Sequence, residues 1–188
     1  MNRWLEEKFH RLTRHRQEHI LRVVDLMEKL AKIHGLPSDD AYLAGWGHDL
    51  ARELSRAELL AEAERYGIAI DEWFRKEPVL LHGPVAARWL NQAQVGSLAV
   101  WEAIEHHTIA GVGLSPLAKA LFIADGVEPG RHFAARAALE QAAYASLDDA
   151  YRKVLDETMT YLTSRGLEPH PNMINALKDS GGNTWTKH

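Results

Sequence analysis

Apolar residues recur at every third or fourth position along most of the chain, a spacing typical of amphipathic helices. The clearest stripe lies between residues 13 and 34, and its members are Ile20, Val23, Val24, Met27, Leu30 and Ala31. Gly35 and Pro37 follow directly and predict the end of that helix. No strand-length run alternates Val, Ile or Thr with polar residues between two turn signals. The pattern therefore predicts an all-α protein.

Residues that favour helix starts predict where the other helices lie. Such starts are indicated at Ser38, Ser55 with Glu58, Ser97, Ser115 with Pro116, and Ser146, while Pro84 fits a first helical turn. The predicted helices cover residues 38–48, 56–66, 83–91, 98–107, 117–125, 133–144 and 148–165. Gly126 and residues 128–131 are predicted to end the helix at 117–125. Residues 68–81 predict a loop with at most a short helix.

The composition is that of a packed globular protein. The 188 residues fit one domain, and 46% hydrophobic with 26% charged residues is ordinary for a chain that folds. Lys and Arg number 22 against 26 Asp and Glu, and the net charge of −4 disfavours binding to nucleic acid or an anionic membrane. No apolar stretch approaches the roughly 18 residues of a membrane span, and the N-terminal segment is charged. We expect a cytoplasmic protein.

Histidine is the residue type that changes this picture. The chain has 11 His and no Cys, so disulfides, thiolate nucleophiles and Cys-based metal sites are excluded. Any metal ion must be held by imidazole and oxygen. Histidine joins metal binding to proton transfer near neutral pH, which makes the histidines the first candidates for chemistry.

Several candidate ligands lie on the apolar faces of predicted helices. His19, His107 and Asp125 each fall on the stripe of their own helix. His48 and Asp49 are adjacent, and because neighbouring helical side chains point about 100° apart, both can bind one ion only where the backbone approaches it closely. Small residues that permit such an approach precede them at Ala44, Gly45 and Gly47. Buried polar residues converging from separate helices need partners, which favours a shared site over isolated buried histidines.

The order of these residues resembles the signature of the HD-domain metal-dependent phosphohydrolases, a His, a His-Asp doublet and a late Asp on separate helices. The resemblance is closest to the YqeK-type branch, the symmetrical dinucleoside tetraphosphate hydrolases. It is carried by residues 15–19 (HRQEH), 48–52 (HDLAR), 81–85 (LHGPV), 103–108 (AIEHHT) and 124–131 (ADGVEPGR). It spans about residues 13–131, and the helices predicted up to about residue 168 fit the length of such a domain.

The resemblance implies a single helical bundle with a metal site in its core. One ion would be held by His19, His48, Asp49 and Asp125. A second would be held by His82 and His107, with Asp49 as a bridge. Imidazole and carboxylate together suit first-row transition metals better than Mg or Ca, which prefer oxygen alone. We therefore expect two divalent transition-metal ions, Fe first, with Mn or Co as alternatives.

The activity that the resemblance implies is phosphoanhydride hydrolysis, the cleavage of diadenosine tetraphosphate at its central anhydride to give two ADP. Two dications lower the pKa of a water held between them and neutralise charge on phosphoryl oxygens. The expected catalytic residues are Asp49, Arg52 and Arg131, with both arginines also clamping phosphates and His106 touching the substrate. Glu128 either orients Arg131 or lies in a solvated loop.

Three positions depart from the family pattern. Arg52 stands where Lys is common, Gly126 where an aromatic residue is frequent, and His106 where Tyr is frequent. Arg52 keeps the positive charge but changes the hydrogen-bond geometry. All three substitutions bear on the nucleoside pocket rather than on the metal ligands.

Two other functions stay open on the sequence alone. One is an HD-domain phosphohydrolase with another nucleotide substrate, and the other is a non-catalytic sensor of a nucleotide alarmone. The complete ligand set argues against the sensor, which has no need of it. We expect an HD domain over residues 1–170 and a partly disordered tail over 171–188. The expected partner is a small nucleotide, and a homodimer is left open.

Overall fold

The computed structural model describes residues 3–182 of the chain. Within that range the backbone forms helices and no strand, which confirms the all-α prediction. In chain order the elements are α1 (Arg3–Phe9), α2 (Arg14–His34), α3 (Ser38–Gly47), α4 (Arg56–Arg65), α5 (Glu72–Lys76), the 3-10 helix η1 (Pro78–Leu81), α6 (His82–Gln92), α7 (Leu98–His106), α8 (Pro116–Val127), α9 (Arg136–Ala145), α10 (Leu147–Ser164) and α11 (Pro171–Asp179).

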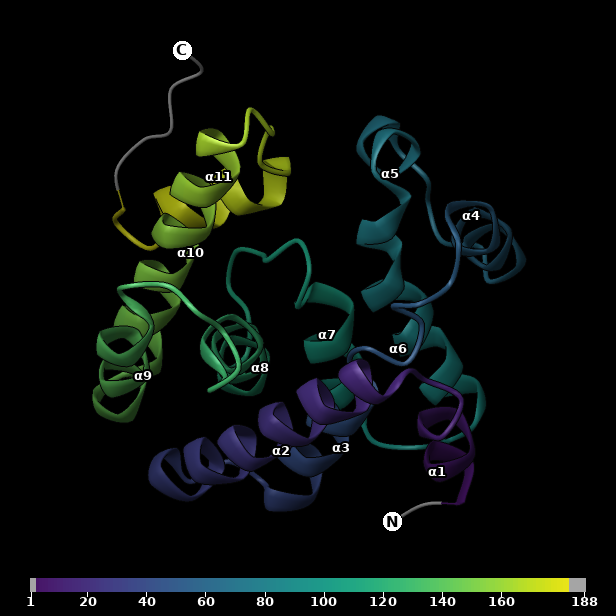
Figure 1. Cartoon of the computed structure of the whole chain (residues 1–188), viewed down its shortest axis with the longest axis horizontal. Helices are drawn as coiled ribbons and strands as arrows, with labels where there is room; N and C mark the ends of the chain where they lie inside the picture. The colour runs from purple at the N-terminus through teal and green to yellow at the C-terminus, as the bar shows by residue number, and fades with distance from the viewer. Residues whose placement is uncertain (1–2, 183–188) are drawn as a thin grey trace.

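Helix α8 is the central helix and is seen end-on in the middle of Figure 1. It packs against α2, α3, α7, α9 and α10. Because neighbours surround it, its buried residues are not confined to one stripe, and they comprise Leu117, Ala118, Ala120, Leu121, Phe122, Ile123, Ala124 and Val127. Asp125 is therefore carried by the helix that the rest of the bundle encloses.

Four helix starts follow the predicted capping serines, whereas the predicted cap at Ser38 is wrong, because α3 already includes Ser38 and its N-cap, Pro37, makes no side-chain capping hydrogen bond. The side chain of Ser55 accepts a hydrogen bond from Glu58 N, and the Glu58 carboxylate accepts one from Ser55 N, so the predicted capping box is present. Ser97, Ser115 and Ser146 likewise cap α7, α8 and α10. These local hydrogen bonds satisfy backbone donors at the helix ends, which is why short-range sequence signals located them.

The two ends of the chain differ from the prediction. The short helix α1 was not predicted, and its Leu5 and Phe9 are buried. Residues 171–179, expected to belong to a partly disordered tail, form α11, which packs on α10 and buries Met173, Ala176 and Leu177. Residues 183–188 lie outside the described residues. The domain boundary at residue 170 stays a prediction.

Two helices also end at residues other than those the sequence predicted. Gly126 does not end α8, which continues to Val127, because a glycine inside a helix keeps its backbone hydrogen bonds and loses only a side chain. Helix α3 stops at Gly47, so the His48-Asp49 doublet lies in the turns that follow rather than on the helix. The amide of His48 still bonds to Ala44 O at 3.1 Å, so it continues the helical geometry by one residue.

Two glycines at the end of α3 bring the doublet close to neighbouring helices. A Cβ on Gly45 would lie 3.0 Å from Val24 Cγ2 of α2, and a Cβ on Gly47 would lie 2.7 Å from Ile104 Cδ1 and 2.8 Å from Leu90 Cδ2. Only a residue without a side chain leaves room for these contacts. The close approach that the sequence analysis expected of these two glycines is therefore present.

None of the helices within residues 3–182 is both long and apolar enough to cross a membrane.

We expect Gly47→Ala to destabilise the protein and to lower its metal content. The new methyl group collides with Ile104 and Leu90, which costs about 1 to 3 kcal/mol and displaces the adjacent His48. Gly67→Ala is the matched control, because Gly67 has φ +64 and open space around it, so that the cost of about 1 to 2 kcal/mol comes from the backbone alone. Urea unfolding and elemental analysis check both variants. Full metal content in Gly47→Ala would contradict this reading.

Candidate metal centre

The structure brings the six predicted ligand residues together from five parts of the fold. His19 comes from α2, His48 and Asp49 follow α3, His82 opens α6, His107 follows α7, and Asp125 lies on α8. His19, His48, Asp49, His82 and His107 are buried, and the side chain of Asp125 is 24% exposed. Two groups of donor atoms lie within 4.8 Å of one another, His19-His48-Asp49 and Asp49-His82-His107.

The carboxylate of Asp49 is shared between two pairs of histidines. Its Oδ2 lies 3.4 Å from His19 Nε2 and 3.6 Å from His48 Nε2. Its Oδ1 lies 3.1 Å from His82 Nε2 and 3.8 Å from His107 Nε2. Each oxygen thus faces one pair, which is the arrangement of a carboxylate that bridges two sites.

Asp125 completes only one of the two groups. Its Oδ1 lies 3.1 Å from His19 Nε2. The group around His19 and His48 therefore has two carboxylates, whereas the group around His82 and His107 has Asp49 alone and opens toward a cleft.

The hydrogen bonds of the Nδ1 atoms determine which nitrogen of each histidine carries a proton. Carbonyl oxygens lie 2.7 Å from His48 Nδ1, 2.5 Å from His82 Nδ1 and 2.7 Å from His107 Nδ1. A carboxylate oxygen of Glu128 lies 3.2 Å from His19 Nδ1. Because carbonyls and carboxylates only accept, each Nδ1 donates, and in the neutral ring Nε2 presents a lone pair.

These lone pairs face one another in pairs. The Nε2 atoms of His19 and His48 are 3.2 Å apart, and those of His82 and His107 are 3.1 Å apart. Two facing lone pairs are stable only with a proton or a metal ion between them. Burial lowers the pKa of His48 to about 4 and also lowers that of His82, which disfavours a proton on either ring. The pKa of His19 is raised, because its contacts with Asp125 and Glu128 outweigh burial, so in the absence of a cation His19 is the member of its pair that carries the proton.

The donor spacing fits metal ions at both positions. Two ligands each about 2.1 Å from one ion, at angles of 90 to 109°, are about 3.0 to 3.4 Å apart. The distances of 3.1 to 3.4 Å that join His82 and His19 to the carboxylates, and the two Nε2 pairs, fall in that range. The distances from Asp49 to His48 and His107, 3.6 and 3.8 Å, are longer and correspond to wider angles at the ion. The buried His and Asp groups of this site are therefore suited to divalent metal ions.

Hydrogen-bonding and charged neighbours keep the two carboxylates ionised. Burial alone would raise the pKa of Asp49, but His48, His107 and His82 outweigh it and hold that pKa well below its usual range. The pKa of Asp125 is likewise lowered against the effect of burial, through its hydrogen bond to His19 and the charge of Arg131. Both side chains thus remain anionic ligands at neutral pH.

Three arginines lie beside this cluster, and they have different partners. Arg16 Nη1 bonds to Asp49 Oδ2, while Arg16 Nε is buried with no hydrogen-bond partner among the described residues. Arg131 donates from Nη2 to Asp125 Oδ1 at 2.7 Å and from Nε to Asp125 O at 3.0 Å. Arg52 lines the cleft, and its side chain makes no hydrogen bond or ion pair within residues 3–182.

Sequence reasoning missed two residues of this site, Arg16 and Arg22, and left the place of Glu128 open. Arg16 and Arg22 lie three residues before and three residues after His19, a helical spacing that could have indicated both. Glu128 is 2% exposed and bonds to His19, so the solvated-loop alternative is wrong. Nothing in its own sequence context marks that contact, because the two residues are 109 positions apart.

His106 does not take the position expected of a substrate contact. Its Nδ1 lies 3.2 Å from Ala110 O, in the turn that follows α7. His106 is not among the described residues that line the cleft, because a side chain adjacent to His107 points to another face of the same helix.

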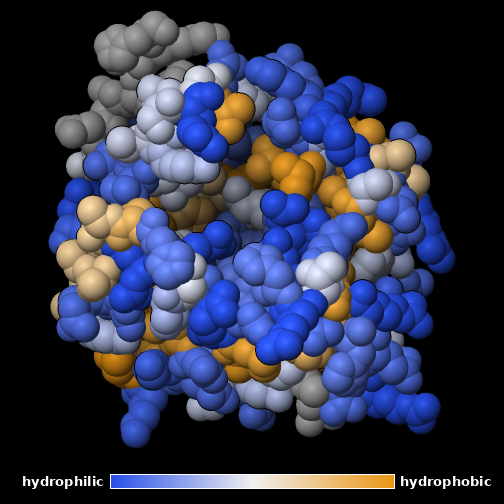
Figure 2. Space-filling view, viewed as in Figure 1, coloured by the Kyte–Doolittle hydropathy of each residue, from blue (hydrophilic) through white to orange (hydrophobic). Residues whose placement is uncertain are grey.

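A cleft of about 560 Å³ opens beside the cluster. Figure 2 shows it as a hollow in the middle of this face, with blue side chains along one part and orange ones along another. The polar part includes Arg16, Arg52 and Arg131. The apolar part comprises Trp73, Val79, Leu80, Phe122, Val154, Leu162, Leu167 and Met173, from η1 and α5 on one side and α8, α10 and the segment up to α11 on the other. The cleft therefore joins a charged site to a surface suited to a flat apolar group.

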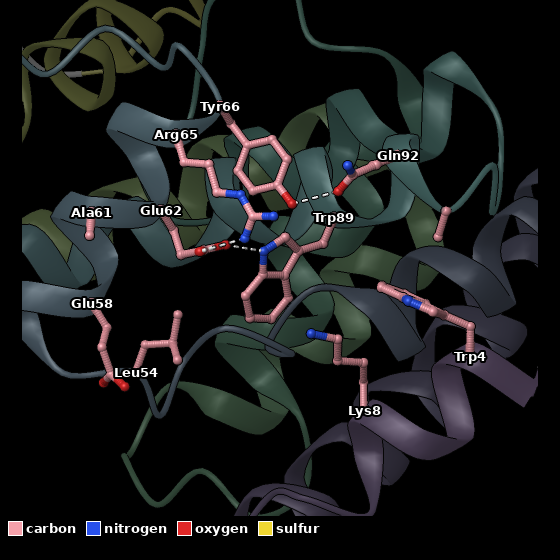
Figure 3. Close-up of a pocket in the computed structure, with 11 residues that line it drawn as sticks. Trp4, Lys8, Leu54, Glu58, Ala61, Glu62, Arg65, Tyr66, Trp89 and Gln92 are labelled. Atoms are coloured by element: carbon pink, nitrogen blue, oxygen red, sulfur yellow. Dashed lines mark hydrogen bonds and ion pairs between the residues drawn. The ribbon is translucent and has the colours of Figure 1, made fainter.

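A second hollow, of about 670 Å³, lies between α1, α4 and α6 and contains none of the six ligands. Figure 3 shows that its polar side chains bond to one another: Trp89 Nε1 donates to Glu62 at 2.6 Å, and Tyr66 donates to Gln92 at 2.6 Å. Lys8 Nζ lies 3.8 Å from the centre of the Trp89 ring. These contacts hold α1 and α4 to α6. The candidate site for chemistry is therefore the cleft beside the six ligand residues.

Comparison with known proteins places this site in a family. Residues 16–130 match the HD domain family. Over 165 residues the chain is 30% identical to a Halalkalibacterium halodurans protein named symmetrical bis(5'-nucleosyl)-tetraphosphatase, covering 87% of each chain. A Bacillus subtilis protein of the same name is 28% identical over 165 residues, covering 86% of this chain and 87% of the relative. A solved structure from Clostridium acetobutylicum, described as a predicted HD superfamily hydrolase involved in NAD metabolism, has a TM-score of 0.89 at 28% identity and covers 94% of both chains.

The chain therefore belongs to the HD domain family, and the resemblance seen in its sequence motifs is confirmed. The matched range contains all six residues of the cluster.

We expect the metal-free protein to lose stability as the pH falls from about 6.5 to about 4. Burial lowers the pKa of His48 from 6.5 to about 4, so the unfolded chain takes up a proton there at a higher pH than the folded chain. The stability that depends on the neutral imidazole is complete above pH 6.5 and is lost toward pH 4. Urea unfolding of chelator-treated protein across this range measures it, and His48→Gln should flatten the dependence. Identical pH profiles for the two proteins would contradict the assignment.

Proposed function

We propose that the protein hydrolyses dinucleoside tetraphosphates symmetrically and converts diadenosine tetraphosphate into two molecules of ADP. Its relatives over most of the chain carry the name of this activity, and it shares their family. The observation that carries the proposal is the pairing of imidazole lone pairs around the divided carboxylate of Asp49. Such a site is built for two cations, and a tetraphosphate is a polyanion that two cations attract.

The proposed metal ligands are those that the resemblance implied. His19, His48, Asp49 and Asp125 hold the first ion. His82, His107 and the other oxygen of Asp49 hold the second. Four imidazoles with two carboxylates favour a first-row transition metal, so we propose two divalent ions, Fe in the first place, with Mn or Co as alternatives.

Bound ions would lower the pKa of a water held between them and offset charge on the phosphoryl oxygens. The chain's own groups determine how the substrate lies. With two dications against Asp49 and Asp125, the site has a net positive charge, and Arg52 and Arg131 add to it from the cleft side. An anionic chain of phosphates is therefore held along the polar part of the cleft.

The arginines have distinct proposed roles in holding that chain. Arg52 has no competing partner among the described side chains, so its donors are available to a phosphate. Arg131 uses Nε and Nη2 on Asp125, so it orients a metal ligand as well as adding charge to the cleft. Arg16, which contacts Asp49, brings a third positive charge close to the reacting phosphates.

The apolar part of the cleft suits one nucleoside of the substrate. Aromatic side chains such as Trp73 and Phe122 line it, and the flat ring of a nucleobase can pack against such side chains. A phosphate chain anchored at the ions and a base placed in this part would leave the central anhydride over Asp49. We therefore propose attack at the central anhydride rather than at an outer one.

We expect metal-loaded protein to contain two ions per chain and Asp49→Ala to lose most of both, because Asp49 serves both groups of donors. His82→Ala should lose the second ion before the first, whereas His19→Ala should empty the first. Elemental analysis after buffer exchange measures the ratio, and chelation should lower the melting temperature of the native protein. An unchanged metal content in Asp49→Ala would refute the ligand assignment.

Two ADP should be the only initial products from diadenosine tetraphosphate. Product chromatography after incubation with Fe(II), Mn(II) or Co(II) tests this, and a panel of other nucleotides supplies the comparison. ATP with AMP would show a different cleavage position. Faster hydrolysis of another nucleotide would favour a different HD-domain phosphohydrolase, and no hydrolysis with any ion would favour the sensor.

Arg52→Ala should lower kcat/KM by roughly ten- to a hundred-fold with metal content unchanged, which corresponds to the loss of one charge-assisted contact of about 1.5 to 3 kcal/mol. Arg75→Ala is a control that removes an exposed arginine from α5, outside the described lining of the cleft. Steady-state kinetics on both variants test whether Arg52 contacts the substrate. Native-like kinetics in Arg52→Ala would remove it from the substrate contacts.

A further inference from the structure

The four histidines of the metal centre are not held in the same way. His48, His82 and His107 each donate from Nδ1 to the carbonyl three residues earlier in the chain. These bonds form within one turn, so each ring is oriented by its own element. His19 instead donates to the side chain of Glu128, which lies beyond the end of α8. The orientation of His19 therefore depends on a contact between distant parts of the fold.

Glu128 is itself held by several donors. Its Oε2 accepts from Arg22 Nε at 2.5 Å and from Gly130 N at 2.5 Å, and its Oε1 accepts from His19 Nδ1 at 3.2 Å. A Cβ on Gly130 would lie 2.5 Å from the Arg22 guanidinium, so only glycine permits this arrangement. Arg22 Nη2 also donates to Oε1, at 3.4 Å. Because donors hold both oxygens, Glu128 has no freedom to turn away from His19.

We propose that Glu128 is a positioning residue for the ion bound by His19 and His48, and that it keeps His19 in the form whose Nε2 can bind that ion. This inference rests on the metal-dependent function proposed above. The contact has no counterpart at His82 or His107, whose Nδ1 atoms bond to backbone carbonyls. Loss of Glu128 therefore weakens one ion and leaves the other in place. Removal of such a partner typically costs 10- to 100-fold in metal affinity.

Glu128→Gln separates this role from a merely structural one, because the amide has the shape of the carboxylate but only one acceptor oxygen. Arg22 and Gly130 both need that oxygen, so the NH₂ group is left facing His19 Nδ1. A donor at that place forces the proton of His19 onto Nε2, where it blocks metal binding. Glu128→Asp keeps both acceptor oxygens and should restore part of the affinity.

Glu140→Gln is the matched control. Glu140 accepts from Arg136 Nη1 at 2.7 Å and from Tyr144 at 2.5 Å on α9, and it contacts none of the six ligands. The Glu140→Gln variant therefore loses a carboxylate that is bonded to an arginine, as Glu128→Gln does. The loss takes place away from the metal centre.

The experiment titrates chelator-treated full-length protein with Co(II), by calorimetry and by the visible absorption of the bound ion. In the native protein and in Glu140→Gln we expect two binding events of unchanged affinity. In Glu128→Gln one event should weaken 10- to 100-fold while the other stays within about two-fold, a contrast that follows from the asymmetric contacts. Nitrogen-15 NMR of the metal-free variant should show His19 protonated at Nε2 and the other three rings at Nδ1.

The proposal is overturned if Glu128→Gln binds both ions as the native protein does, or if both events weaken equally at an unchanged melting temperature of the metal-free protein. If the glutamine variant does not fold, Glu128→Asp and the NMR spectrum of native His19 decide. A native metal-free His19 with its proton on Nε2 and none on Nδ1 overturns the proposal. A native protein that binds two ions but cleaves no dinucleotide refutes the proposed function alone.

Discussion

Asp49 divides its two carboxylate oxygens between two pairs of histidines, and the arrangement of the bundle depends on keeping those five side chains within reach of one another. A buried carboxylate is costly unless positive or hydrogen-bonding groups surround it. Here the histidines supply that environment and hold the pKa of Asp49 well below its usual range. The same imidazoles direct their lone pairs at one another, so the cluster as a whole is stable with cations in its centre. The charge balance of this cluster and the packing of the helices that carry it therefore depend on each other.

Close backbone approach is the structural means to that end. Gly45 and Gly47 let the end of α3 lie against α2, α6 and α7. The backbone of the turn that follows therefore places His48 and Asp49 in the interior, and neither side chain has to reach there from a distance. Helix α8, which packs against five other helices, carries Asp125 to the same point. Packing to crystal-like density leaves these elements little freedom, and small shifts in them would alter metal–ligand distances directly.

Around this cluster a second set of charged groups links its histidines and carboxylates to the cleft. Arg16 contacts Asp49, Arg131 contacts Asp125, and Glu128 contacts His19, so three of the six ligands have an ionic partner from outside the cluster. Two of those partners, Arg16 and Arg131, line the cleft. The same two arginines therefore contact both the cluster and the open volume of the cleft.

The sequence by itself determined most of the helices, the capping serines of α4, α7, α8 and α10, and the six ligand candidates, because helical periodicity, capping and motif order are local properties that a linear pattern records. It could not determine that α3 ends before His48, that residues 171–179 form a packed helix, or that Glu128 is buried against His19. Each of these depends on contacts between segments far apart in the chain, such as the 109 residues that separate Glu128 from His19. The sharing of Asp49 between two histidine pairs likewise depends on contacts between distant segments. It was implied by family resemblance, but only the packing of α2, α3, α6, α7 and α8 around one point puts both oxygens to use.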